Sequence, residues 1–536
     1  MKLTCRPLFD TDSFAGKYMN KDADVTRFYD YEWDDEESRL EDIDQTTYPR
    51  RELSEALTAY QIKHGGSPQS LDHARALAHE QAAVVVGGQQ AGLLTGPAYT
   101  IHKAVSIILE AERLQQKWDR PFIPMFWIAG EDHDVDEINN TFVHHRQELA
   151  REKIFGRNDK RTPASERYIK QSEADAAIDA LLAHINETQW TARLREELRS
   201  MTEEPLTYSS WCAKVMLYLF ADSGLVVMDA HHPDVRKLEQ ETFLTMLDRS
   251  SAIQESVQQA AAEFEKGGYE NPVNLDKENM HLFIHHQDER FLLYNEGNTI
   301  KEKNGSRSWD YEAFFTQAQK GDFQFSNNVI TRPVMQDILL PVHTFIAGAG
   351  ELKYWGLLQG AFHAMNHHMP LVRPRDSFTW ISRKTKKTMM DYQLTPEQAA
   401  DETTAHLQEQ LKQQWKAADE SAAAEKAERL MREALKPLSE VLQDDRQLHD
   451  TYNKKAAALI DAYRQDVTKA VDARVHVDTV RLESLETELR PGNAKQERVL
   501  NILPFLNVYG PDLIEGLLRR LRDKDTNTPR DWFIYL

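Results

Sequence analysis

The sequence contains very little cysteine. Of its 536 residues only Cys5 and Cys212 are cysteines, and they lie far apart in the chain. Two distant cysteines provide neither a disulfide framework nor a cysteine-based zinc site. We therefore expect both to be small buried hydrophobic side chains, and we expect no bound metal.

Long apolar runs are also missing. No uninterrupted apolar stretch approaches the ~20 residues that a membrane span needs, and the N-terminal MKLTCRPLFDTDSFAGKYM has no apolar signal segment. Hydrophobic residues make up 41% and charged residues 28% of the chain, as in ordinary soluble proteins. We expect a cytoplasmic protein that makes no membrane contact and has roughly three or four domain-sized units.

Basic residues are fewer than acidic ones, 65 against 86, which gives a formal net charge of −21. A broad nucleic-acid surface needs clustered Lys and Arg, so nucleic acid is not an expected partner. A small anionic ligand needs only one local basic pocket. Two phosphate-binding motifs are absent as well: no G-x-x-x-x-G-K-[ST] occurs, and GGQQAG lacks the G-x-G-x-x-G spacing.

What the chain does contain is a strand–loop–helix–strand pattern over residues 81–140. It predicts a buried strand at 82–86, a glycine-rich loop, a helix at 97–116 and a second strand at 122–128. Ligands of such βαβ units bind outside the carboxyl ends of the strands. The polar residues expected there are Gln89, Gln90, Thr95, Tyr99, His102, Lys103, Glu131, Asp132, His133 and Asp134.

The rest of the chain alternates between core segments and insertions. Residues 1–80 read as helical, 141–205 and 235–325 as insertions, and 206–234, 326–393 and 491–536 as core. Further strands are predicted at 224–229, 340–346 and 371–373, with helices at 209–220 and 351–367 and a hairpin turning at 287–289. The pattern predicts an α/β, doubly wound core with two excursions.

Residues 394–490 have a different composition, which is rich in Ala, Glu, Gln, Lys and Leu. A Thr-Pro-Glu-Gln helix start opens the segment and a Pro-Gly pair closes it. Its apolar stripes are narrow, which is typical of a coiled coil. They comprise Leu407, Leu411 and Trp415, then Leu459, Tyr463, Val467 and Val471. One two-helix hairpin would leave part of these stripes exposed, so we expect the arm to form a homodimer.

The segment GGQQAGLLTGPAYTIHKA followed by WIAGEDHDVDEIN resembles the BshC family, the cysteine-adding enzyme of bacillithiol biosynthesis. The resemblance continues through PLVRPRDSF and PGNAKQERVLNILPFLNVYGPDLI, and so covers nearly the whole chain. It implies a Rossmann-type core with connective-peptide insertions, a long α-helical coiled-coil arm and dimerisation through that arm. It also implies ligation of cysteine to glucosaminyl malate.

Four residues are the catalytic candidates. His102 and Lys103 lie near a helix N-terminus, where free N–H groups attract phosphates and carboxylates. TIHK is similar in placement to the histidine signature of class I aminoacyl-tRNA synthetases. Asp132 and His133 could bind the cysteine amine or act as acid and base. The alternatives are a partly buried capping interaction for the first pair and capping of the next helix for the second.

Two further groups are binding candidates. Arg373, Arg375 and Asp376 follow the fifth strand, and two guanidinium forks suit a dicarboxylate such as the malyl group. A structural Arg–Asp pair is the alternative. Gln89, Gln90, Thr95, Tyr99 and Asp134 complete the expected substrate site. A nucleotide pocket is the hypothesis for Asn493, Lys495, Gln496 and Arg498, and interdomain hydrogen bonding is the alternative.

Forming an amide from a carboxylate requires activation, so we expect ATP or another adenine nucleotide. The leading interpretation is a cysteine ligase acting at the surface from Gln89 to Asp134. A class I synthetase-like or nucleotidyltransferase-like enzyme acting on another amino acid is the second. A catalytically inactive dimeric scaffold is the third, disfavoured because polar residues gather at three strand ends. The histidine pairs 144–145, 231–232, 285–286 and 367–368 are assigned mostly to the surface or the insertions.

Overall fold

We describe the protein from a computed structural model. It describes residues 1–145, 148–154, 161–273, 275–401, 406–407, 409–410, 420–441, 446–524 and 527–536. The chain divides into two compact units, the first comprising residues 1–145, 149–379 and 497–534, and the second built around residues 380–496. Within the described ranges, no helix has the length and apolar character needed to cross a membrane.

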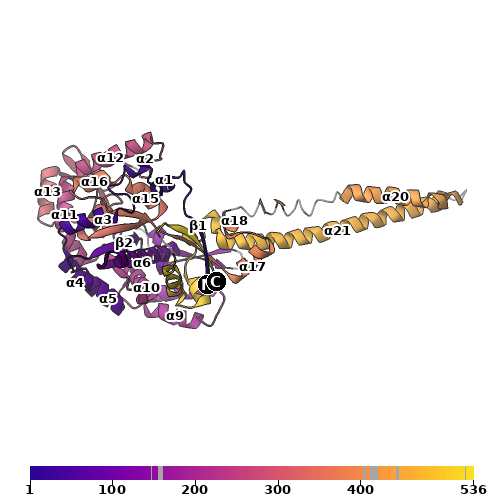
Figure 1. Cartoon of the computed structure of the whole chain (residues 1–536), viewed down its shortest axis with the longest axis horizontal. Coiled ribbons are helices and arrows are strands. Elements are labelled where there is room, and N and C mark those ends of the chain that lie inside the picture. The colour runs from indigo at the N-terminus through magenta and orange to yellow at the C-terminus, as the bar shows by residue number, and fades with distance from the viewer. Residues whose placement is uncertain are drawn as a thin grey trace. The chain divides into compact units, whose positions relative to one another are not determined.

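A five-stranded parallel sheet forms the centre of the first unit (Figure 1). Its order is β15 (Leu371–Pro374), β14 (Val342–Ala347), β2 (Ala83–Gln89), β3 (Phe122–Ile128) and β8 (Val226–Asp229). In chain order this is 5-4-1-2-3, the Rossmann arrangement read from the other edge. The direction of winding reverses between β2 and β14, so their carboxyl ends mark the topological switch point. The predicted doubly wound core is confirmed.

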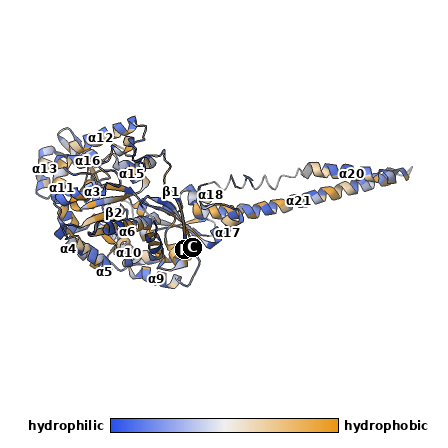
Figure 2. Ribbon diagram, in the orientation of Figure 1, coloured by the Kyte–Doolittle hydropathy of each residue, from blue (hydrophilic) through white to orange (hydrophobic). Residues whose placement is uncertain are grey.

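The strands form because they are apolar on both faces, as buried parallel strands must be. Every residue of β3, FIPMFWI, is buried, and Figure 2 shows the central strands in hydrophobic colours. Helix α6 (Tyr99–Trp118) packs against β2 and β3 and buries Ile101, Ala104 and Ile108. In Figure 1, α6 and α10 (Tyr208–Leu219) cover one face of the sheet, whereas α15 (Ala349–Trp355) and α16 (Gln359–Ala364) cover the other.

One local prediction is wrong. The helix expected over 351–367 is the pair α15 and α16, broken at Gly356. A Cβ at Gly356 would meet the Phe264 ring at 2.8 Å, so the glycine allows a close approach while disfavouring helix. Residues 1–80 also contain a strand, β1 (Lys2–Pro7), beside the helices α1 (Phe14–Met19), α2 (Ala23–Thr26), α3 (Glu36–Gln45), α4 (Arg50–Lys63) and α5 (Pro68–Ala76). β1 pairs with β17 (Arg530–Tyr535), which also pairs with β16 (Ser377–Ile381).

The strands of the first insertion are short, and most of its regular structure is helical. It carries α7 (Val135–Ile138), β4 (Asn140–His145), β5 (Glu148–Lys153), β6 (Tyr168–Ile169), α8 (Gln171–His184), α9 (Thr191–Ser200) and β7 (Leu206–Thr207). β4 pairs with β5, and β6 pairs with β7.

The second insertion carries its own five-stranded sheet, in the order β12-β11-β10-β9-β13. Its elements are α11 (Pro233–Asp248), α12 (Ser250–Lys266), β9 (Asn279–His286), β10 (Glu289–Glu296), β11 (Thr299–Glu302), β12 (Ser308–Asp310), α13 (Tyr311–Gln319) and β13 (Gln324–Asn327). α14 (Thr331–Leu339) leads back to the core. The predicted hairpin is confirmed, and Gln287 and Asp288 turn it with φ of 51° and 64°.

The second unit contains α17 (Arg383–Asp391), α18 (Pro396–Asp401) and the helices of the arm, α20 (Glu420–Val441) and α21 (Arg446–Leu489), which lie side by side (Figure 1). The predicted coiled-coil arm is confirmed. Two of the residues assigned to its seam, Leu459 and Tyr463, are each 73% exposed. Leu411 and Trp415 lie outside the described residues. After the turn at Pro491–Asn493 come α22 (Gln496–Val499), α23 (Leu503–Tyr509) and α24 (Leu513–Arg522).

Candidate functional site

A buried lysine paired with a partly exposed glutamate occupies the topological switch point. The Lys103 Nζ donates to the Gly88 carbonyl at 2.8 Å and to Glu351 Oε2 at 2.6 Å. Burial lowers the pKa of Lys103, and the negative charge of Glu351 opposes that shift. Lys103 comes from α6, which follows β2, and Glu351 from α15, which follows β14. The pair therefore joins the two strands at which the winding of the sheet reverses.

Several predicted binding residues gather beside this pair. Gln89 Nε2 donates to the Tyr99 hydroxyl at 3.1 Å, and the Lys103 Nζ lies 3.4 Å from Gln89 Oε1. Thr95 is buried in the intervening loop, where it and Leu94 have φ of 72° and 50°. Non-glycine residues in this left-handed region are strained, and such strain concentrates at functional sites.

His102 lies in the core behind the switch point. Its Nδ1 is 2.7 Å from Glu497 Oε2, and its side chain is fully buried. Burial lowers the pKa of His102, while Glu497 raises it. From the sequence, we expect His102 to lie with the acidic residues at the carboxyl ends of the strands. The contact with Glu497 instead gives it a positioning role inside the fold.

The arginines also contact protein carboxylates. Arg375 donates to Glu497 Oε2 at 2.9 Å and Oε1 at 2.8 Å, and Arg373 donates to Glu110 at 3.0 Å. Burial raises the pKa of Glu497, but Arg375 and His102 outweigh it and hold that pKa well below its usual range. The two guanidinium groups expected to bind a dicarboxylate thus contact Glu497 and Glu110. This resembles the alternative of a structural Arg–Asp pair, except that the partners are glutamates.

Asp376 is buried, and its carboxylate bonds to other residues of the core. It accepts hydrogen bonds from the Arg530 N–H at 2.7 Å and from Trp532 Nε1 at 3.2 Å. Burial raises the pKa of Asp376 to about 6. These bonds attach β17 to the end of β15.

The acidic loop after β3 forms a second cluster. Asp132 accepts from Gln90 Nε2 at 2.7 Å, and Arg290 of β10 lies 3.8 Å from the same carboxylate and 3.5 Å from His133 Nδ1. Burial raises the pKa of Asp132, but Gln90 and Arg290 outweigh it and lower that pKa. Burial and Arg290 lower the pKa of His133. The cluster therefore pairs an ionised carboxylate with a neutral imidazole, and both side chains are about a third exposed, 33% and 28%.

This loop does not cap the next helix through its side chains, which was the alternative. Asp134 is exposed at the N-terminus of α7 and makes no side-chain cap bond. Gln89 and Gln90 are consecutive residues, so they connect the switch-point cluster with the Asp132–His133 cluster along one edge of the sheet. Glu351, Glu497 and Arg290 were missed because each lies more than 120 residues from its partners.

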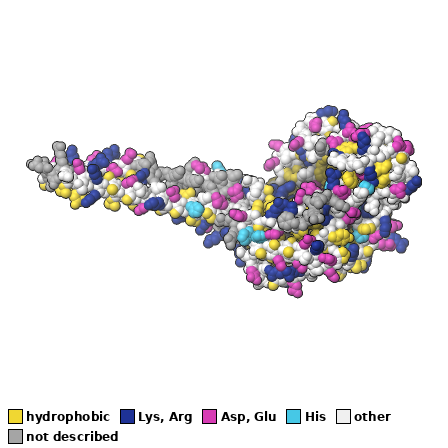
Figure 3. All heavy atoms as spheres, turned by 180° about the vertical axis from the view of Figure 1, so that it is seen from behind, with side chains coloured by type: hydrophobic (Ala, Val, Ile, Leu, Met, Phe, Trp, Pro, Cys, Tyr) yellow, Lys and Arg dark blue, Asp and Glu magenta, His cyan; other side chains and the backbone are white. Residues whose placement is uncertain are grey.

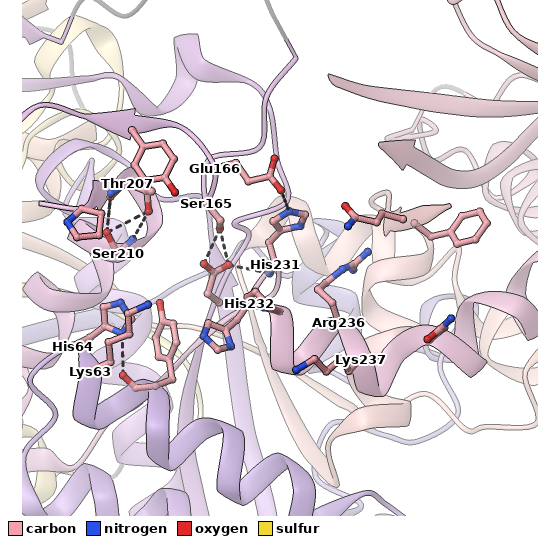
Figure 4. Close-up of a pocket in the computed structure, with 18 of the residues that line it drawn as sticks. Lys63, His64, Ser165, Glu166, Thr207, Ser210, His231, His232, Arg236 and Lys237 are labelled. Atoms are coloured by element: carbon pink, nitrogen blue, oxygen red, sulfur yellow. Dashed lines mark hydrogen bonds and ion pairs between the residues drawn. The ribbon is translucent and has the colours of Figure 1, made fainter. Parts of the chain in front are cut away.

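A pocket of about 840 Å³ lies at the carboxyl end of β8 (Figure 4). Asp229 ends β8 and accepts from the Ser165 hydroxyl at 2.7 Å and from the His231 N–H at 2.9 Å. Burial raises the pKa of Asp229. A Cβ at Gly130 would overlap with the Asp229 carboxylate and the Ser165 hydroxyl, so glycine lets the acidic loop approach the pocket.

Histidines line two sides of this pocket. His64, which caps the C-terminus of α4, is buried, and burial lowers its pKa to about 4; His231 and His232 follow β8. Most histidine pairs were assigned to the surface or the insertions, whereas the pair 231–232 belongs to a core segment and lines the pocket. A signal was present in the sequence: DAHHPD follows its strand as GEDHD follows the preceding one. Burial and the charge of His231 lower the pKa of His285 in β9 to about 2.

The residues assigned to a nucleotide pocket differ in exposure. Within the second unit, the Gln496 amide is buried and accepts from the Trp380 N–H at 2.8 Å and donates to the Trp380 carbonyl at 2.9 Å. Asn493 and Lys495 are exposed, as is Arg498 in the first unit. Gln496 therefore stabilises the main chain, and a nucleotide role for the other three stays a prediction.

A Rossmann-ordered sheet with a carboxylate, an imidazole and a lysine at its carboxyl edge defines an α/β enzyme of the Rossmann-like class. Residues 1–376 match the family model "Bacillithiol biosynthesis BshC, N-terminal Rossmann-like domain", and residues 378–528 match "Bacillithiol biosynthesis BshC, C-terminal coiled-coil domain". The chain belongs to this family.

Full-length relatives agree with that assignment. A protein of Bacillus cytotoxicus is 32% identical over 519 residues, covering 94% of this chain and 95% of its own. One of Bacillus velezensis is 32% identical over 526 residues, covering 95% and 96%. One of Bacillus licheniformis is 30% identical over 532 residues, covering 96% and 97%. Each is named "Putative cysteine ligase BshC". The protein is thus an enzyme of a family named as ligases.

Proposed function

We propose that the protein joins the carboxyl group of L-cysteine to the amine of glucosaminyl malate by an amide bond. The names of the relatives support this reaction class. The structural observation that carries the proposal is the position of Asp132 beside His133, both about a third exposed, at the carboxyl edge of the Rossmann sheet. This edge is where such sheets bind their ligands.

The two residues suit different parts of the reaction. An ionised carboxylate binds an ammonium group by charge-assisted hydrogen bonds, so Asp132 would hold the amino group of cysteine. An amine attacks a carbonyl only when neutral, and a neutral imidazole can accept its proton, so His133 would act as general base. Gln90 and Arg290 orient Asp132 through the contacts at 2.7 and 3.8 Å.

ATP or another adenine nucleotide would activate the cysteine carboxylate. The switch point offers space for it: Gly350, at the start of α15, has no atom within 4 Å of the position that a Cβ would occupy. Tyr99 and Gln89 would hold the nucleotide on the β2 side, and the main chain around Gly350 would hold it on the β14 side. The Lys103–Glu351 pair would keep these two walls at a fixed separation.

The test is direct. Purified protein is incubated with cysteine, glucosaminyl malate and ATP, and the amide product is measured by mass spectrometry. Calorimetric titrations with each compound alone and in pairs identify what binds first. Product that requires all three compounds supports the proposal. Binding of none of the three would overturn it, and product formed from another amino acid in place of cysteine would favour the second interpretation.

We also propose that the arm forms a homodimer. Apolar side chains exposed on its described helices are Leu430, Leu438, Val441, Leu448, Tyr452, Leu459, Tyr463 and Val477. Figure 3 shows hydrophobic side chains on the arm surface among charges of both signs. Contiguous apolar side chains on a helical surface indicate an interaction site, and a second copy of the arm would cover them.

A further inference from the structure

Three possible metal ligands meet beside the pocket at the end of β8. Glu166 comes from the first insertion, His231 follows β8, and His285 comes from β9 of the second insertion. One donor atom from each lies within 4.8 Å of the other two. Glu166 Oε1 and His231 Nε2 are 2.8 Å apart, the bond drawn between them in Figure 4. The proposed ligation mechanism uses none of the three residues.

We propose that Glu166, His231 and His285 bind a transition-metal ion of the zinc class, with one coordination position open toward the pocket. Resting on the proposed function, we further infer that this position takes the thiolate of the cysteine substrate. Asp132 and His133 would then act on the amino and carboxyl ends of a substrate whose sulfur is held separately.

The separation of the two imidazole rings fits one shared ion, although the rings are stacked with an angle of only 25° between their planes. With metal–nitrogen bonds of about 2.1 Å and tetrahedral angles, two ligating imidazoles have ring centroids roughly 5 Å apart. The centroids of His231 and His285 are 5.1 Å apart. Three protein ligands with a fourth position left open is the arrangement of catalytic zinc sites, whereas structural sites use all four.

The surroundings of the rings also favour coordination. His285 Nε2 lies 2.9 Å from the Ser326 hydroxyl, a contact of the kind that orients a ligating ring through its second nitrogen. The His231 side chain is only 9% exposed, and its Nδ1 has no hydrogen-bond partner in the described part of the chain. Glu166 and His231 line the 840 Å³ pocket, so the open position is accessible to a small molecule.

Both neighbouring arginines lie close to carboxylates. Arg236 donates to Glu239 at 2.5 Å and lies 3.6 Å from Glu131. Arg290 lies 3.8 Å from Asp132. Glu166 then adds a negative charge of its own, and Asp229 contacts the His231 main chain at 2.9 Å. These carboxylates reduce the repulsion that the two arginines exert on positive charge at His285.

A metal would give the enzyme a way to choose cysteine over serine. The two amino acids differ by one atom, and shape alone discriminates poorly between such similar substrates. A soft thiolate is a strong ligand of zinc-class ions, while a serine hydroxyl is a weak one. On binding, the thiol releases its proton to solvent, since the ligand must be deprotonated.

Cobalt(II) reports both steps by visible absorption. The full-length protein is stripped with a chelator and titrated with Co²⁺ alone, then with cysteine or serine. We expect one Co²⁺ per chain, and a sulfur-to-cobalt charge-transfer band with cysteine but not with serine. His285→Gln and Glu166→Gln should each weaken Co²⁺ binding by about 100-fold. His286→Gln, at the next position of β9, is the matched control and should bind as the wild type does.

The outcomes separate the possibilities. Equal Co²⁺ affinity in the wild type and both variants, with folding verified by circular dichroism, would overturn the metal site. Co²⁺ binding without a cysteine-dependent band would overturn the thiolate role. A cysteine-dependent band without any amide product would count against the proposed ligation and leave the metal site standing. Because Glu166 is 41% exposed, Glu166→Gln keeps the test valid if His285→Gln fails to fold.

Discussion

Arg375 donates two hydrogen bonds to the Glu497 carboxylate, at 2.9 and 2.8 Å, and both side chains are buried. The same carboxylate lies 2.7 Å from His102 Nδ1. One ionised group therefore joins α6, the chain after β15 and α22, which are hundreds of residues apart. Ion pairs of this kind are strongly destabilising when one partner is removed, because a charge is left buried without compensation.

Replacing Arg375 tests this structural role. Arg375→Met should lower the free energy of unfolding by about 3–5 kcal/mol, since Glu497 would lose both of its bonds to the guanidinium. The exposed Arg498, one residue after Glu497, gives the control Arg498→Met, for which we expect little change. Thermal unfolding followed by circular dichroism measures both. If Arg375→Met unfolds like the wild type but binds glucosaminyl malate less tightly, the arginine is a substrate ligand after all.

The pH dependence of stability provides a second test. The pKa of Glu497 is lower in the folded protein than in the unfolded chain, so its stabilising contribution is present above the usual glutamate pKa and is lost as the pH falls below it. Wild-type protein should therefore lose more stability between pH 6 and pH 3 than Glu497→Gln. These pH values bracket the ordinary glutamate pKa of about 4.3. Parallel pH profiles for the two proteins would show that Glu497 carries no such linkage.

Asp132→Asn and His133→Ala should each reduce product formation by at least about 100-fold, the lower range for a general acid–base group. Both side chains are partly exposed, so unfolding temperatures should stay close to the wild-type value. Asp136→Asn, an exposed carboxylate in the same acidic run, is the control. The double variant should be no worse than the poorer single variant, because residues that act as a unit are not additive. Full activity in either single variant would remove this cluster from the mechanism.

The rate should also depend on pH in a specific direction. Burial and Arg290 lower the pKa of His133, so the ring remains a neutral base when the pH falls below the usual histidine value of about 6.5. We expect kcat to stay level as the pH is lowered through that value. Arg290→Gln removes one of the two causes, so its kcat should begin to fall at a higher pH. Superimposable profiles would exclude His133 as the titrating base.

The proposed homodimer is expected to depend on the exposed apolar residues of α21. Leu459→Glu together with Tyr463→Glu should convert a dimer into a monomer, since both side chains are 73% exposed and each substitution places a charge in the expected seam. Gln465→Glu is the control, because it adds one charge at an exposed polar position of the same helix. Sedimentation velocity at micromolar concentration distinguishes the species. A monomeric wild type would contradict the proposal at once.

Much of the fold could be predicted from local sequence patterns. The apolar run of β3, the hairpin at Gln287 and Asp288 and the helices of the arm are all properties of contiguous residues, so periodicity and turn chemistry were enough to predict them. The acidic loop after β3 was also predictable as a site, because strand ends of βαβ units face a common edge. β1 was not, since its partner β17 lies more than 500 residues away.

The sequence by itself determined which residue types reach the carboxyl edge of the sheet: the glutamines after β2, the carboxylates after β3 and the histidines after β8. Only the tertiary structure decided which of them are paired. The sequence neighbours of Arg375 are compatible with ligand binding. In the structure, however, Glu497 accepts a hydrogen bond from each of the two terminal nitrogens of the guanidinium group. The physical reason is that burying a charge requires a partner of opposite sign, and the chain supplies that partner from a distant segment that no local pattern reveals.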